Sequence, residues 1–263
     1  RSRFDRLLEE LRAHNVRGMN PGSMLYCTTD GAAAQIASIG KRGYCIGDVE
    51  MGDEPDGKHA MPEDYAALYL QWATAIHKVD PKLKLGGPIF EGVNEDITVW
   101  PDAQGRTSWM GRFVEYLKAH GRLADLAFVS FEHYPFEPCT ITWKTLYTEP
   151  QLMKHILQVW RDDGVPKDVP LMVTENHLAA SLTGPMTTIF AALWLADNIG
   201  SFFEGGGAAF YHSPLQPQGL QDSCLGWASW SNFVSNEHYD IKGYTSPYFA
   251  AQMSHLEWVQ HRY

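Results

Sequence analysis

Residues 45–58 read CIGDVEMGDEPDGK and join an apolar run to a cluster of acidic side chains. The first eight residues have the alternating apolar composition of a β-strand. Gly52 and Pro55 are residue types that end a strand and begin a turn. The sequence therefore predicts a strand at 45–52, with Glu54 in the turn just beyond its carboxyl end.

Outside this stretch, short apolar runs alternate with segments of helical periodicity. Strands are predicted at 24–27, 83–88, 126–134, 170–176 and 208–213, with 16–19 as a weaker candidate. Helices are predicted at 3–13, 62–80, 107–121, 150–163, 185–203 and 247–260. Such alternation indicates a parallel sheet, either an open doubly wound sheet or a closed barrel.

The loops favour the barrel. Connections from helix to strand are short, whereas those from strand to helix, at 89–106, 135–149 and 213–246, are long and lie where parallel α/β folds keep their active sites. A nucleotide-binding sheet normally has a glycine-rich turn after a strand, but GGGAA at 205–209 precedes one. We therefore predict an α/β fold of the (β/α)8 TIM-barrel type. Because a full barrel has eight strands, we expect residues 1–263 to form a single barrel domain lacking its first one or two strands.

The composition excludes several functional classes. A net charge of −10 with dispersed acids argues against a nucleic-acid surface, and no apolar run reaches the ~20 residues of a membrane span. The four cysteines form no CxxC pair, so neither a zinc site nor another cofactor is predicted. The 9 Trp and 12 Tyr suit ligands with flat apolar faces and many hydroxyls, such as sugars. The oligomeric state is left open.

A second carboxylate ends another predicted strand. Residues 170–176 read PLMVTEN and place Glu175 near the carboxyl end of that strand. In a barrel, parallel strands present their carboxyl ends at one mouth, so Glu54 and Glu175 can converge there. Glycoside cleavage needs one protonated carboxylic acid and one ionised carboxylate. Because an ionised Glu175 would disfavour ionisation of Glu54, we assign Glu54 as the acid.

Three segments together resemble glycoside hydrolase clan A. VEMGDEPDG resembles its strand-four signature, FVSFEHYP its strand six and VPLMVTEN its strand seven, and the resemblance covers about residues 25–260. The 39, 44 and 51 family types are the most similar. The resemblance implies cofactor-free hydrolysis of a β-linked polysaccharide or oligosaccharide with retention, by a secreted or periplasmic protein. It also implies that Glu54 is the acid/base and Glu175 the nucleophile.

The resemblance implies further contacts with the substrate. His133 and Tyr134 would lie beside the nucleophile, and His212 would help form the floor of the glycone subsite. The long loop offers Trp227 and Trp230 as stacking platforms. One departure concerns Asp53, since the clan usually has an Asn there that donates a hydrogen bond to the sugar 2-hydroxyl. An ionised Asp can only accept, and it adds a negative charge next to the acid/base.

Other interpretations stay open. A carbohydrate-binding barrel without turnover would explain Asp53. A metal-dependent barrel hydrolase could use His133, His177 and His212, although the sequence has no HxH or HExxH spacing. Glu54 could also simply cap the helix that follows it.

Overall fold

The computed structural model describes residues 3–91, 94–137, 140–180, 186, 188–212 and 231–258. One sheet of these residues has the strand order β1-β2-β3-β4-β5-β6. Its strands are β1 (Gly18–Gly22), β2 (Ile46–Met51), β3 (Lys84–Phe90), β4 (Phe128–His133), β5 (Leu171–Asn176) and β6 (Ala209–Phe210). Within this sheet β1 pairs in parallel with β2, β2 with β3, β3 with β4, and β5 with β6.

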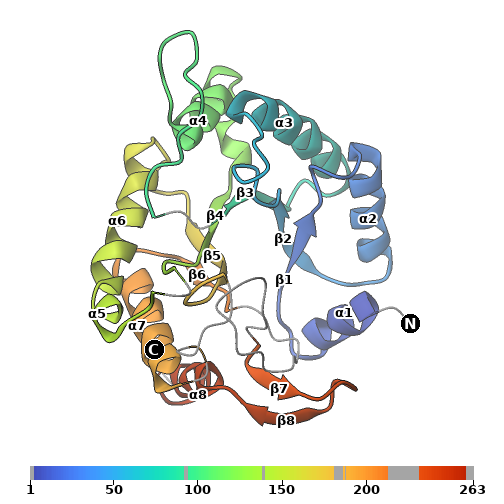
Figure 1. Ribbon diagram of the computed structural model, residues 1–263. Coiled ribbons are helices and arrows are strands. Elements are labelled where there is room, and N and C mark those ends of the chain that lie inside the picture. Colours follow the sequence, from blue (N-terminus) through green and yellow to red (C-terminus); the bar gives the residue numbers. More distant parts are fainter. Residues whose placement is uncertain are drawn as a thin grey trace. The chain divides into compact units, whose positions relative to one another are not determined.

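Helices alternate with these strands along the chain (Figure 1). They are α1 (Arg3–Ala13), α2 (Thr29–Lys41), α3 (Pro62–Val79), α4 (Trp109–Ala119), α5 (Trp143–Leu146), α6 (Glu149–Asp162), α7 (Ile189–Glu204) and α8 (Ser246–Met253), with short turns η1 (Leu123–Asp125) and η3 (Ser254–Trp258). A parallel sheet in sequence order with intervening helices is the pattern of a (β/α) barrel, which confirms the predicted fold class.

The chain divides into two compact units. The first comprises Arg1–Glu91, Asp96–Phe131 and Trp160–Pro170, and the second comprises Gly92–Glu95, Glu132–Val159 and Leu171–Tyr263. The expectation of a single domain stays a prediction.

An aromatic core in the first unit positions the end of β2. Helix α3 begins with Pro62 at its first turn and buries the apolar face that its periodicity predicts, including Tyr65. The Tyr65 ring makes edge-to-face contacts with Trp109 and Phe113 of α4, at centroid distances of 5.2 and 5.3 Å. The Tyr65 hydroxyl donates to the carbonyl of Met51, the last residue of β2. The core thereby fixes the strand end from which the acidic loop leaves.

The second unit has its own core around α7. Phe190, Trp194 and Leu195 of this helix are buried together with Leu146 of α5 and Leu178, which follows β5. Helix α7 begins where the Thr188 side chain accepts a hydrogen bond from the Phe190 amide at 3.2 Å. The packing places one face of α7 beside the segment that carries Glu175.

The predicted strand at 24–27 is wrong, and the weaker candidate at 16–19 marks the actual strand, β1. Met24 begins a turn in which its amide donates to the carbonyl of Gly22 at 2.6 Å, and Tyr26 is exposed. The sequence of β1, GMNPG, has little strand propensity. It pairs because it comes first in the sheet order, where the missing N–H of Pro21 costs no hydrogen bond to an inner strand.

Helices α2 and α5 and strands β7 and β8 were not predicted. Helix α2 has an Ala-rich sequence that buries Ala32, Ile36 and Ile39, so its apolar stripe contains only two large side chains. Part of the predicted loop 213–246 forms an antiparallel pair, β7 (Phe233–Ser235) and β8 (Ile241–Tyr244).

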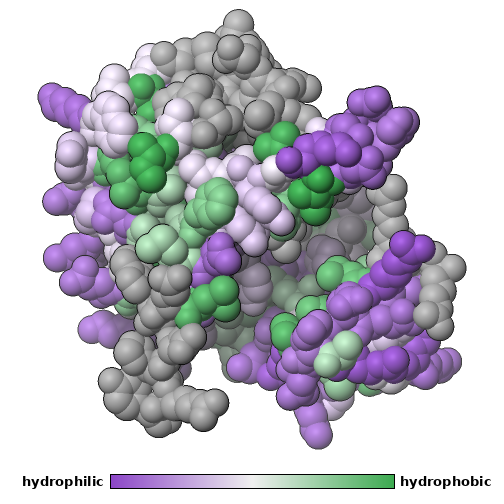
Figure 2. Space-filling model, turned by 90° about the horizontal axis from the view of Figure 1, so that it is seen from below, coloured by the Kyte–Doolittle hydropathy of each residue, from purple (hydrophilic) through white to green (hydrophobic). Residues whose placement is uncertain are grey.

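The surface is mainly polar on the face drawn in Figure 2. Strongly hydrophilic residues gather there in several groups, and hydrophobic residues lie between them in small separate patches. Among the described residues, none of the helices has both the length and the apolar character that crossing a bilayer requires.

Candidate active site

Glu54 lies in the tight loop between β2 and α3, in the first unit. Its φ is +46°, and its amide donates to the carbonyl of Ile89 at 2.9 Å, which ties the loop to the end of β3. Gly52 has a φ of +128°, and a Cβ at this position would lie 2.7 Å from the carbonyl oxygen of Pro88. Only glycine fits this turn easily. A non-glycine residue held at positive φ costs about 1 kcal/mol or more and is typical of functional sites.

Lys58 joins the two acids of this loop. Its Nζ lies 3.0 Å from Asp53 Oδ2 and 3.0 Å from Glu54 Oε2. Partial burial lowers the pKa of Lys58, but the hydrogen bonds to Glu54 and Asp53 raise it, and the net pKa lies above its ordinary value. Lys58 is therefore an ammonium that offsets the charge of Asp53. Sequence analysis missed this residue, although its position four residues after Glu54 was a usable signal.

Asp56 is a third carboxyl group in the same loop. Both of its oxygens lie 3.2 Å from the amide nitrogen of Glu91, which follows β3. Burial raises the pKa of Asp56 to about 6, against the effect of that backbone hydrogen bond. The loop after β2 and the end of β3 are thus fastened to each other through side chain and backbone.

Glu175 and Tyr134 meet in the second unit. Tyr134 follows directly after β4, and its hydroxyl donates to Glu175 Oε1 near the end of β5. Both side chains are partly buried. The contact fixes one carboxylate oxygen of Glu175 beside the end of β4.

His133 lies in the interior of the second unit. Its side chain is fully buried, and its Nε2 is 2.7 Å from Glu149 Oε1. Glu149 also accepts hydrogen bonds from Trp194 Nε1 at 2.9 Å and from Asn198 Nδ2 at 2.6 Å. Burial raises the pKa of Glu149, but the His133 charge and the three donors bring it below its ordinary value. In this geometry His133 supports the strand end that carries Tyr134, and a contact with sugar stays a prediction.

His212, after β6, contacts two asparagine side chains, one of them the neighbour of Glu175. Its Nδ1 lies 2.9 Å from Asn176 Oδ1 and its Nε2 lies 3.0 Å from Asn232 Oδ1. Burial lowers the pKa of His212 to about 4, although the Asn232 contact raises it. The ring fixes Asn176, which follows Glu175 in the chain.

The remaining predicted residues are placed as follows. His177 is buried beside His212, and burial followed by that neighbour lowers its pKa. Within the described part of the chain, no group of three or more His, Cys, Asp or Glu side chains is arranged to hold a metal ion. Trp227 and Trp230 lie outside the described residues.

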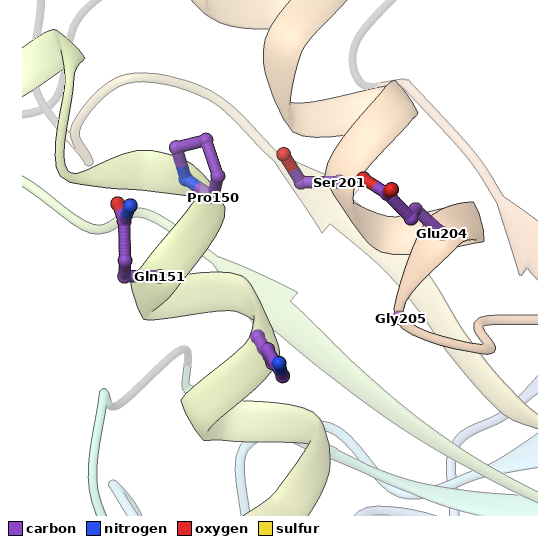
Figure 3. A pocket seen from close by; sticks show the side chains of 6 residues that line it. Pro150, Gln151, Ser201, Glu204 and Gly205 are labelled. Carbon is purple, nitrogen blue, oxygen red and sulfur yellow. The ribbon is translucent and has the colours of Figure 1, made fainter.

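A separate pocket of about 350 Å³ lies between α6 and α7. Figure 3 shows Pro150 and Gln151 of α6 on one side of it, and Ser201 and Glu204 of α7 on the other. It contains none of the predicted site residues. This pocket is a gap between two helices and not an extension of the strand-end site.

No protein-family model matches the sequence, and no curated protein matches it by sequence. Solved structures do resemble this chain. The GH51 arabinofuranosidase from Xanthomonas axonopodis pv. citri matches 94% of this chain and 53% of its own at 12% identity, with a TM-score of 0.64. A 4-O-α-L-rhamnosyl-β-D-glucuronidase from Fusarium oxysporum 12S matches 91% of this chain and 49% of its own at 14% identity, with a TM-score of 0.61. The chain has the fold of these glycoside hydrolases.

A GH44 endoglucanase from Clostridium thermocellum is also similar, at 15% identity over 68% of this chain and 46% of its own, with a TM-score of 0.53. The chain spans about half the length of the solved structures that it matches. The fold that the resemblance to clan A implied is therefore confirmed.

Proposed function

We propose that residues 1–263 form one barrel domain that acts as a glycoside hydrolase, cleaving a β-linked polysaccharide or oligosaccharide with retention of configuration. Glu175 is the nucleophile and Glu54 the acid/base. The observation that best supports this is the Tyr134–Glu175 hydrogen bond near the ends of two strands, in a fold shared with glycoside hydrolases. A secreted or periplasmic location belongs to the same proposal.

The reaction takes place in two displacements. A Glu175 oxygen attacks the anomeric carbon while the glycosidic C–O bond breaks and Glu54 gives its proton to the leaving oxygen. Water then attacks the anomeric carbon of the glycosyl ester, Glu54 takes the proton of that water, and Glu175 leaves as a carboxylate. Retention by this route requires the two carboxyl groups to be about 5–5.5 Å apart when substrate is bound.

The neighbouring side chains suit these roles. The Tyr134 hydroxyl donates to Glu175 Oε1, which holds the carboxylate in place for the attack. Lys58 holds Glu54 and Asp53 at 3.0 Å each, which fixes the acid/base in the loop. Asp53 then accepts a hydrogen bond from a sugar hydroxyl, at the position where the clan usually has an Asn donor.

A mechanism-based label tests the proposal. A 2-fluoro glycoside with a good leaving group should form a stable ester on Glu175, detected by peptide mass spectrometry, and Glu175→Gln should take up no label. Glu54→Gln should still form the ester with the activated reagent but should lose hydrolysis of natural linkages. Labelling of another carboxylate, or inversion observed by NMR of the product, would contradict the assignment.

Labelling, together with binding and chelation assays, separates this proposal from its alternatives. A carbohydrate-binding barrel would bind oligosaccharides but neither react with the label nor release reducing ends. A metal-dependent hydrolase would lose activity on treatment with a chelator and regain it with added metal. For the proposed enzyme, chelation should leave the rate unchanged.

A further inference from the structure

A second pocket, in the first unit, is formed partly by the loop that carries Glu54. Its volume is about 500 Å³, within the range of small-ligand sites, and its lining includes Asp56, His59 and Trp100. The Trp100 residue is 83% exposed, whereas Trp72 and Trp109 of the same unit are almost fully buried. Such a large exposed aromatic residue at the wall of a pocket requires an explanation.

The backbone that carries Trp100 is held firmly. It belongs to a short antiparallel segment in which Thr98 bridges Ser108, and the Val99 amide donates to the carbonyl of Thr107 at 2.9 Å. Arg112 Nη1 donates to the carbonyl of Trp100 at 2.6 Å.

Arg112 is itself fixed by a two-point ion pair. Its Nε and Nη2 each lie 2.7 Å from a carboxylate oxygen of Glu63, and the guanidinium is almost fully buried. Such bidentate pairs have defined geometry as well as strength. Trp100 therefore presents its indole from a preorganised segment, so the binding of a ligand that stacks on it includes no free-energy cost for ordering a loop.

The polar residues of the pocket suit a sugar. Asp56 is oriented by the Glu91 amide at 3.2 Å and offers acceptor oxygens, and His59 offers a ring nitrogen. An aromatic face with a few oriented polar groups matches a pyranose, which has apolar C–H faces and hydroxyls around its edge. Since Asp56 is the one charged carboxyl group of the pocket lining, an uncharged sugar fits better than a uronic acid.

The loop that contributes Asp56 and His59 to the pocket indicates which part of the substrate binds there. Asp56 and His59 belong to the same loop as Glu54, the residue that protonates the leaving oxygen in the proposed reaction. Building on that proposed function, we infer that the Trp100 pocket binds an uncharged sugar unit on the leaving-group side of an extended β-linked chain. The substrate is then a glycan cut internally, and not a terminal sugar released from a small aglycone.

Chain-length kinetics test this inference. Wild type, Trp100→Ala and a matched control, Tyr147→Ala, are compared on β-1,4-linked gluco- and xylo-oligosaccharides of two to six units and on the corresponding aryl monosides. Tyr147 is also strongly exposed but does not line the pocket. Trp100→Ala should lower kcat/KM for the longest active oligosaccharide by about 5–10-fold, mainly through KM, and change that for aryl monosides less than twofold. The control should follow wild type.

Equal losses on long and short substrates, or no loss at all, would overturn the inference. So would the absence of any turnover or binding of the longer chains. An altered oligomeric state of Trp100→Ala in light scattering, with an unchanged chain-length profile, would show that the surface contacts a second copy instead. Thermal unfolding of both variants identifies a misfolded protein, and Asp56→Asn then replaces Trp100→Ala, with the same selective loss on long chains expected.

Calorimetric binding of the oligosaccharides to Glu175→Gln keeps the two proposals apart. If the chemical label fails but Trp100→Ala in this background weakens binding, the pocket binds sugar as inferred and the catalytic assignment fails. If Glu175 is labelled but Trp100→Ala binds normally, the catalytic assignment holds and the pocket inference fails.

Discussion

Replacing Lys58 by Met should slow the cleavage of natural linkages. The Lys58 ammonium lies 3.0 Å from Glu54 Oε2 and 3.0 Å from Asp53 Oδ2, so it holds the proposed acid/base in the loop. The first displacement requires the Glu54 carboxyl group at the leaving oxygen. Without the ammonium, the Glu54 side chain loses the contact that fixes it there.

The size of the effect follows from the distance and the exposure. At 3.0 Å, two unit charges interact by about 1.4 kcal/mol in bulk water and by about 5.5 kcal/mol at an effective dielectric constant of 20. The Lys58 and Glu54 side chains are 28% and 27% exposed, so desolvation, solvent screening and side-chain ordering offset most of this energy. A net effect of about 1 kcal/mol corresponds to a loss of about fivefold in rate.

The assay is kcat/KM on two substrates, one with a poor leaving group, for which proton donation by Glu54 limits the rate, and one with an activated leaving group, which needs less assistance. Lys58→Met should lose about fivefold on the first substrate, and Lys58→Arg, which keeps a cation, should stay within about twofold of wild type. A second control, Lys242→Met, removes an exposed lysine that pairs with Asp240. An unchanged kcat/KM in Lys58→Met, or an equal loss on both substrates, would refute the reasoning.

Three further predictions concern stability and catalysis. Glu149→Ala leaves three buried donors without an acceptor, so the free energy of unfolding in urea should fall by about 3 kcal/mol or more. The control is Glu115→Ala, which changes an exposed side chain. A loss below about 1 kcal/mol in Glu149→Ala would contradict this. Burial, followed by the charge of Asp96, raises the pKa of Asp163 from 3.8 to about 7, so wild-type stability should fall as pH rises through this window. Asp163→Asn should remove roughly 1–2 kcal/mol of that pH dependence, after allowance for partial exposure, and equal slopes in thermal melts between pH 4 and 8 would rule this out. Tyr134→Phe removes the donor to Glu175, so kcat should fall about 10–100-fold with little change in melting temperature, whereas unchanged kcat would show that the contact has no role in the reaction.

Much of the fold and the positions of the two glutamates along the chain could be predicted because they depend on local chemistry. The apolar runs of β2 and β5 and the periodicity of α3 are visible in short windows. Gly52 ends β2 with a φ of +128°, a conformation that glycine adopts readily, so Glu54 follows the strand as predicted. Glu175 is the second-last residue of β5, at the end of an apolar run that is visible in the sequence.

Features that depend on distant partners were not predictable. The strand β1 has a weak sequence and forms because β2 offers it a pairing edge. The acceptor role of Glu149 depends on α7 donors that lie 45 and 49 residues further along the chain.

The exposure of Trp100 was not predictable either. Its residue type favours burial, and its exposure follows from the Arg112–Glu63 pair that holds its backbone. The sequence by itself determined which residues end the strands, because turns are made by neighbours in the chain. Only the tertiary structure decided which side chains are buried, paired or exposed, because burial and hydrogen bonding depend on groups that come together through folding.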